Sequence, residues 1–167
     1  MIIKNIKDGK YKIESTGEYG KVEILMSDGL VEIEGAPFVI DTSGEYEIKG
    51  IHVYGVNGSK DKNPVFLIIS QEKVKIAYIS ALKEPLSQEQ VDELSDTDIL
   101  LTFLTDENVK AIEDIDPNLF IPINYSPDLL QKYFSGVTPR TQDKISIKSK
   151  EELTEEMEIA VFETPLK

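Results

Sequence analysis

The first half of the chain alternates apolar and charged residues with a period of two. Three segments show this pattern, and each is bounded by Gly, Asp or Ser: GKYKIES (9–15), GKVEILMSD (20–28) and GLVEIEG (29–35). Such alternation is typical of antiparallel strands that bury one face. Ser27, Asp28 and Gly29 are expected to form a hairpin turn, because Gly29 can adopt the positive φ that such turns need.

Four further segments continue the strand pattern up to residue 80. They are APFVID (36–41), GEYEIKGIHVYGV (44–56), PVFLIIS (64–70) and KVKIAYIS (73–80). Residues 65–69 are all apolar, which suits a strand that is buried on both faces.

The second half changes to an alternation of strands and helices. Ser87 and Gln90 fit a capping box at a helix start, Asp106 is expected to begin a second helix, and Ser126 with Pro127 predicts a third. Between and after these helices lie four apolar segments that predict strands: DILLTFL (98–104), LFIPIN (119–124), KISIKS (144–149) and MEIAVFE (157–163). This order predicts an α/β protein in which residues 1–167 form one domain.

The composition limits the possible partners and compartments. The 167 residues include no cysteine, and 31 acidic residues against 18 basic ones give a formal net charge of −13. Nucleic-acid binding requires a cationic face, so this balance argues against it. No long apolar run is present, which predicts neither a signal peptide nor a membrane span. We therefore expect a cytoplasmic protein with no nucleic-acid or membrane partner.

The residues alone offer little conventional chemistry. His52 is the single histidine, whereas a catalytic zinc ion needs three protein ligands. In an unbroken strand His52 would share a face with Tyr46, Ile48 and Tyr54, and a bulge at Gly50 would shift that register. Nucleophile-elbow and phosphate-binding motifs are missing from the sequence. We assign no catalytic residue and no cofactor on these grounds.

A carboxylate site for Mg²⁺ stays open as an alternative. It would draw on Asp41, Asp96 or Asp98, but only Asp96 and Asp98 have the spacing of a paired site. The same pair would equally well end the preceding helix and enter the next strand.

Several ordered segments resemble a known family. They are GEYEIKGIHVYGV (44–56), IAYISALKEPLSQEQVDELSDTDILL (76–101), LFIPINY (119–125) and DKISIKSKEELTEEMEIAV (143–161). Together, from Gly44 to about Ile159, they resemble a short member of the metallo-β-lactamase superfamily, in the branch related to L-ascorbate-6-phosphate lactonase. The resemblance implies an αββα sandwich of two mixed β-sheets with reduced outer helices.

The chain departs from that family at the metal ligands. Where the family strand ends in His-Leu-Gly-Asp, this chain reads Tyr78-Ile-Ser-Ala81, and where the family has a ligand histidine before Tyr125, this chain has Asn124. His52 coincides with none of these positions. The resemblance therefore implies vestigial ligand positions at Tyr78, Ala81 and Asn124 and a metal-free site. Zinc, manganese or iron is expected only if this interpretation is wrong.

Three functions follow as hypotheses. The first is a degenerate, metal-free protein that acts as a non-catalytic binding or assembly module. Its inherited cleft would involve Asp41, His52, Glu84 and Tyr125, and it would bind an unknown protein partner or a second copy. The second is a metal-dependent hydrolase with an unconventional carboxylate site. The third is a purely structural homo-oligomer in which the cleft is filled.

Overall fold

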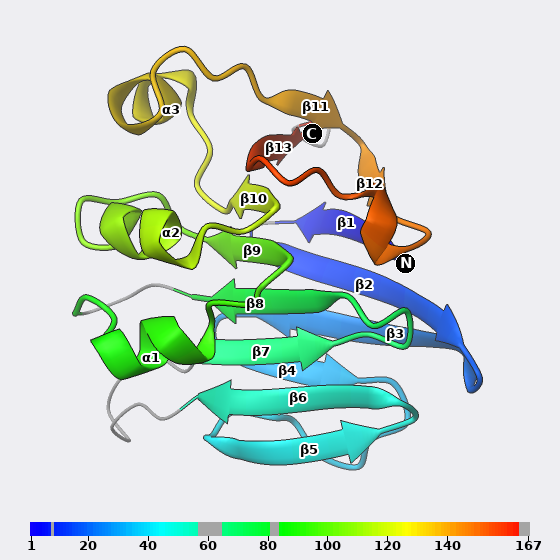
Figure 1. Cartoon of the computed structure of the whole chain (residues 1–167). Coiled ribbons are helices and arrows are strands. Elements are labelled where there is room, and N and C mark those ends of the chain that lie inside the picture. The colour runs from blue at the N-terminus through cyan, green and yellow to red at the C-terminus, as the bar shows by residue number, and fades with distance from the viewer. Residues whose placement is uncertain (8, 57–64, 81–83, 164–167) are drawn as a thin grey trace.

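Two β-sheets pack face to face in the computed structural model, which describes residues 1–7, 9–56, 65–80 and 84–163 (Figure 1). The first sheet, sheet A, has the strand order β12-β1-β2-β3-β4, and all of its neighbouring strands are antiparallel. Its strands are β1 (Ile2–Lys7), β2 (Lys10–Gly17), β3 (Gly20–Ser27), β4 (Leu30–Ile33) and β12 (Lys144–Ser146).

The second sheet, sheet B, has the order β11-β13-β10-β9-β8-β7-β6-β5. Strands β5 to β8 are antiparallel neighbours, whereas β8, β9, β10, β13 and β11 run parallel, so the mixed pairing is confined to this sheet. Its strands are β5 (Gly44–Ile48), β6 (Ile51–Val56), β7 (Val65–Ile69), β8 (Lys75–Ile79), β9 (Ile99–Thr102), β10 (Leu119–Pro122), β11 (Arg140–Gln142) and β13 (Glu158–Phe162).

The helices are short, and the first and the third begin at side-chain caps. They are α1 (Gln88–Glu93), α2 (Val109–Ile115), α3 (Pro127–Tyr133) and one 3₁₀ turn (Lys150–Glu152). Ser87 and Gln90 form both bonds of the predicted capping box, and the Ser126 hydroxyl accepts from the N–H of Leu129 with Pro127 in the first turn. These two helix starts are confirmed.

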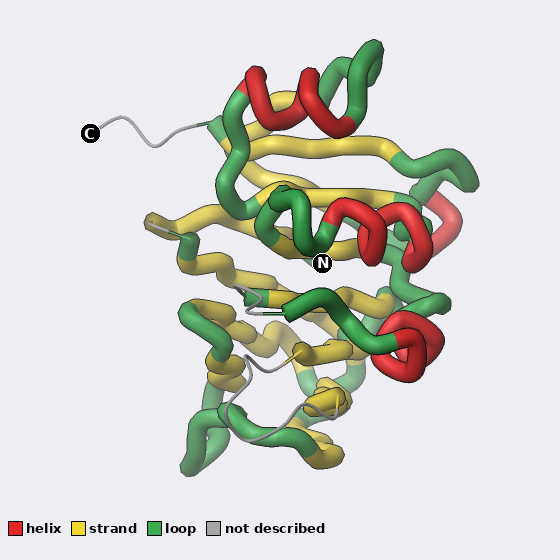
Figure 2. The backbone as a smooth tube through the Cα atoms, turned by 90° about the vertical axis from the view of Figure 1, so that its left-hand side faces the viewer, coloured by secondary structure: helices red, strands yellow, loops and turns green. Residues whose placement is uncertain are grey.

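Two apolar layers hold the molecule together. Between the sheets lies a core that includes Ile13, Ile24, Val53 and Ile76. A second core lies between sheet B and the helices, around Leu100, Phe120 and Ile112. In Figure 2 the helices lie at the periphery of a body built mainly from strands. None of the described helices has the length and apolar character needed to cross a membrane.

The outer face of sheet A is covered by charged side chains. Lys4 bonds Glu14 at 2.8 Å, and Lys12 lies 3.3 Å from Glu23 on the neighbouring strand. Cross-strand pairs of opposite charge suit a solvated face. In the described part of the chain no helix covers this side, so the outer helices implied by the family resemblance are found on sheet B alone.

Two hairpin turns have the same two-residue form. Asp28 and Gly29 both have positive φ, as do Lys49 and Gly50, which is the signature of a type I′ turn. The first turn confirms the prediction. The second divides the predicted strand 44–56 into β5 and β6, so the register of an unbroken strand is wrong for Tyr46 and Ile48, and the shift expected at Gly50 takes the form of a turn. His52 and Tyr54 share the outer face of β6, as predicted. His52 pairs with Glu47 across the hairpin, while Tyr46 and Ile48 face the core between the sheets.

Other predicted boundaries also need correction. Of the predicted strand 36–41, only Ile40 pairs, through two backbone bonds to Val31, because Pro37 cannot donate and the segment turns instead. The second helix begins at Val109 and not at Asp106, whose carboxylate accepts from Lys132 and Tyr133 of α3. Strands β1 and β11 were missed by sequence reasoning.

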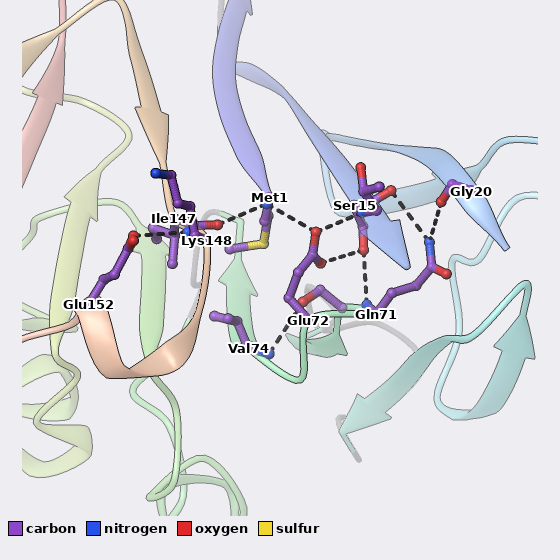
Figure 3. Close-up of polar contacts among 11 residues, drawn as sticks. Met1, Ser15, Gly20, Gln71, Glu72, Val74, Ile147, Lys148 and Glu152 are labelled. Carbon is purple, nitrogen blue, oxygen red and sulfur yellow. Dashed lines mark hydrogen bonds and ion pairs between the residues drawn. The ribbon is translucent and has the colours of Figure 1, made fainter. Parts of the chain in front are cut away.

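A polar clasp joins the two sheets at the turn between β7 and β8 (Figure 3). The Glu72 carboxylate of this turn accepts from the Ser15 hydroxyl and from the Thr16 N–H, each at 2.7 Å, and lies 3.0 Å from the amino group of Met1. Its neighbour Gln71 donates to the carbonyl oxygen of Gly20 at 2.9 Å. Sheet B is thereby fixed against the β2–β3 hairpin of sheet A.

Burial raises the pKa of the Glu72 carboxyl, but the donors from Thr16, Ser15 and Met1 lower it more strongly, and the resulting pKa lies below its ordinary value. A carboxyl with a lowered pKa in the folded state stabilises the fold above its unfolded pKa. That contribution is lost as the pH falls through the lower, folded pKa.

We therefore predict that Glu72→Gln lowers the free energy of unfolding at pH 7 by about 2 kcal/mol, because it weakens charge-assisted hydrogen bonds in a partly dehydrated site. The difference from the unsubstituted protein should shrink as the pH falls below the ordinary pKa of a glutamate carboxyl and through the lower pKa of Glu72 in the folded state. Urea unfolding at a series of pH values measures both effects. Glu113→Gln, on the exposed side of α2, is the matched control. A pH-independent difference would contradict the assignment.

Candidate functional site

Three parallel strands end at the same edge of sheet B. In β8, β9 and β10, Ile79 aligns with Thr102, and Thr102 aligns with Pro122. Ligand sites in sheets of this kind lie beyond the carboxyl ends of the strands. Tyr78, near the end of β8, and Asn124, two residues beyond β10, therefore belong to this edge, which we call the carboxyl edge. Ala81 lies outside the described residues.

Tyr78 points into the core between the sheets. Within β8, Ile76 and Tyr78 belong to the core between the sheets, whereas Ala77 and Ile79 belong to the core beneath the helices. The Tyr78 side chain is 1% exposed, and its hydroxyl accepts from the N–H of Gly29 at 3.4 Å. Gly29 is part of the β3–β4 turn of sheet A, so the tyrosine spans the gap between the two sheets.

Aromatic rings fill this end of the sandwich. Burial raises the pKa of Tyr78, and the same cause, with a smaller contribution from Tyr78, raises the pKa of Tyr11 to about 12. Tyr11 lies in β2 with its ring centre 5.8 Å from that of Phe162 in β13. Both tyrosines are therefore neutral phenols near neutral pH, and a neutral phenol is a poor ligand for a divalent metal ion.

Asn124 uses both ends of its amide on one backbone position. Its Oδ1 accepts from the N–H of Leu104 at 2.8 Å, and its Nδ2 donates to the carbonyl oxygen of Leu104 at 3.3 Å. These two bonds fasten the loop after β9 to the loop after β10. The amide thus bonds the N–H and the carbonyl oxygen of one residue, as the backbone of a neighbouring strand would. Its role is structural.

Asn108 was missed by sequence reasoning although it organises the same edge. Its side chain is 2% exposed. Its Oδ1 accepts from the backbone and hydroxyl of Thr105, and its Nδ2 donates to Thr102 and to the carbonyl oxygen of Phe103. Asn108 could have indicated a turn over residues 105–108, since asparagine often bonds to nearby backbone. The sequence prediction instead placed a helix start at Asp106.

The remaining candidate residues lie apart from this edge or at its surface. His52 is on the outer face of β6, with its Nδ1 3.9 Å from a Glu47 oxygen. Asp41 and Glu84 are exposed in loops, and Tyr125 is 40% exposed next to Asn124. The structure therefore places Tyr78, Asn124 and Tyr125 at the same edge of sheet B, but Tyr78 faces the core between the sheets whereas Asn124 bonds Leu104 of the core beneath the helices. His52 lies on the outer face of β6, away from this edge.

Asp98 lies at the opposite end of the parallel strands. One oxygen accepts from the N–H of Lys75 at 2.8 Å, and the other lies 2.9 Å from the ammonium group of Lys150. Asp98 is 2% exposed, so these bonds satisfy a buried carboxylate. Asp98 thus joins the starts of β8 and β9, while Asp96 is exposed and lies 3.5 Å from the ammonium group of Lys75.

The donors at Tyr78 and Asn124 do not fit a divalent metal. One position holds a buried neutral phenol, and another holds an amide whose oxygen and nitrogen are both occupied by backbone. No group of three or more His, Cys, Asp or Glu side chains suited to a metal ion occurs among the described residues. We therefore derive no chemical step through a metal.

Comparison with known proteins identifies the family. Residues 23–124, more than half of the chain, match the family model described as the beta-lactamase superfamily domain. A crystal structure from Thermotoga maritima, of a protein proposed to be a Zn-dependent hydrolase of the metallo-β-lactamase superfamily, matches with a TM-score of 0.68. It shares 17% sequence identity and the match covers 98% of each chain. No curated protein matches.

This chain belongs to the metallo-β-lactamase superfamily. At 17% identity the structural match establishes the fold, and the activity proposed for the Thermotoga maritima protein remains a statement about that protein.

If Tyr78 fills the carboxyl edge, its ring should matter far more than its hydroxyl. We predict that Tyr78→Ala lowers the free energy of unfolding by about 3–5 kcal/mol, because it leaves a cavity between the sheets. Tyr78→Phe should cost less than about 1 kcal/mol, because only one long hydrogen bond is lost. Urea unfolding measures both, with Tyr125→Ala as the exposed control. Equal stability of Tyr78→Ala and the unsubstituted protein would show that the ring is not packed.

Proposed function

We propose that this chain is a metal-free member of the superfamily that acts as a non-catalytic binding or assembly module. The observation that carries the proposal is the use of Tyr78 and Asn124 as structural contacts. The resemblance of the sequence to the family implies metal ligands at these two positions. A side chain bonded to backbone on another element is oriented by those bonds, and a metal would have to compete with them.

The branch of the superfamily to which the chain belongs, and the cellular compartment, are part of the same proposal. The ordered segments 44–56, 76–101 and 119–125 support descent from the branch related to L-ascorbate-6-phosphate lactonase. A chain without cysteine and with a net charge of −13 is suited to a reducing, crowded compartment such as the cytoplasm.

A hydrolase is the alternative that experiment should exclude first. We predict that protein purified without chelators or affinity metals contains far less than one zinc, manganese or iron ion per chain. Added metal should leave the thermal midpoint unchanged, because a ligand that does not bind the folded state cannot stabilise it. Elemental analysis by mass spectrometry and thermal scans with each metal provide the measurements.

The matched activity test uses phosphoester and lactone substrates with each metal added. No turnover above that of the same metal and substrate without protein is expected. A near-stoichiometric metal content, or turnover that requires one metal, would contradict the proposal and favour the carboxylate-based hydrolase.

A further inference from the structure

The outer face of sheet B is covered unequally. Over β8, β9 and β10, the helices bury apolar side chains such as Ala77, Leu100 and Phe120. Over β5, β6 and the part of β7 around Ile69, no helix of the described chain lies on the sheet. In Figure 1 no helix lies in front of β5 or β6. The uncovered part is built from two cross-strand rows.

Those rows are polar on β5 and become apolar toward β7. Glu45, Tyr54 and Leu67 align across three strands, and Glu47, His52 and Ile69 form the next row. Strand β7 is apolar at all five positions, and its outward residues Leu67 and Ile69 are half-buried although no helix rests on Ile69. Antiparallel sheets that face water usually alternate apolar and polar residues, so β7 departs from this pattern, while β5 beside it keeps the charged residues Glu45 and Glu47 on the same face.

A groove crosses this face. It has a volume of about 570 Å³ and is lined by Tyr54, Leu67, Ile69 and Lys75, with Glu45 on one side and Glu93, the last residue of α1, on the other. The volume lies within the range of sites that accept a few side chains or a small ligand. The floor is apolar and aromatic, and the walls are acidic.

The charges of the groove are not balanced. Glu45 and Glu93 are exposed, and within the described residues neither has an ion-pair partner. The ammonium group of Lys75 lies 3.5 Å from Asp96 and is therefore already compensated. With a net charge of −13 for the whole chain, a second copy would bring acidic walls against acidic walls. Like charges across an interface are costly, whereas a cationic partner would be attracted.

We propose that this groove binds a short basic segment of a partner protein. An aliphatic or aromatic side chain of that segment packs on Leu67, Ile69 and the Tyr54 ring, and flanking Lys or Arg side chains pair with Glu45 and Glu93. This assignment deepens the proposed binding function and rests on it. The groove lies on the outer face of β5 to β7, away from Tyr78 and Asn124. The peptide-binding assignment and the metal-free proposal can therefore fail separately.

The experiment titrates the full, isotope-labelled chain with three heptapeptides while amide chemical shifts are recorded. KKLFLKK has the apolar centre and the cationic flanks, EELFLEE reverses the charge, and KKSGSKK lacks the apolar centre. We expect micromolar binding of KKLFLKK alone, with shifts at Tyr54, Leu67 and Ile69, and weaker binding at higher salt.

The variant pair separates specific from general charge effects. Glu45→Lys with Glu93→Lys should weaken binding of KKLFLKK by about tenfold or more. Glu113→Lys with Glu155→Lys makes the same change in net charge at exposed positions outside the groove and should leave binding within about twofold.

Five outcomes would overturn the assignment, four of them in the peptide and sedimentation experiments. These four are equal loss in both variant pairs, equal binding of KKSGSKK, shifts confined to other surfaces, and self-association of the chain through this face in sedimentation. Spermine binding in the groove without peptide binding would likewise overturn it in favour of a small cation. Stoichiometric metal in the purified protein, with peptide binding intact, would remove the non-catalytic proposal and leave the groove assignment standing.

Discussion

The parallel pairing of β8, β9 and β10 is the constraint on which the functional edge depends. Their aligned ends place the residues after each strand side by side, whatever side chains the sequence supplies there. In this chain the supplied groups are a phenol and an amide. The Tyr78 hydroxyl accepts a hydrogen bond from Gly29 of sheet A, and the Asn124 amide bonds both the N–H and the carbonyl oxygen of Leu104. The aligned strand ends are present, and their side chains hold loops and sheets together.

Much of the fold could be predicted because local signals agree with the tertiary structure. The alternation in residues 9–35 gave the antiparallel strands, Gly29 marked its turn, and Ser87 and Ser126 capped their helices where expected. The register of Tyr46 and Ile48 relative to His52 could not be obtained in this way. Lys49 and Gly50 form a two-residue turn in a segment that reads as one strand, and a turn of this length returns the chain on itself and changes which residues share a face.

The candidate site was less accessible from sequence than the fold. That Tyr78 and Asn124 lie at one edge followed from the family resemblance, but their bonding partners are distant in sequence: Gly29 is 49 residues from Tyr78, and Leu104 is 20 residues from Asn124. The role of Asn108 depends on the path of a loop, and the buried tie of Asp98 to Lys150 depends on a turn more than 50 residues away. Periodicity reports which face of an element is buried and gives no information on such contacts.

Tyr78 and Asn124 at the carboxyl edge are bonded to other parts of the chain, and a crystal structure tests most directly whether they leave a metal unbound. Crystals soaked in zinc or manganese and measured at the absorption edge of the metal would locate any bound ion. The account predicts Tyr78 within hydrogen-bond distance of Gly29 and no anomalous peak beside Asn124. A peak within about 2.3 Å of Tyr78, Asn124 or the residues that follow β8, at the distance of a true metal–ligand bond, would contradict it.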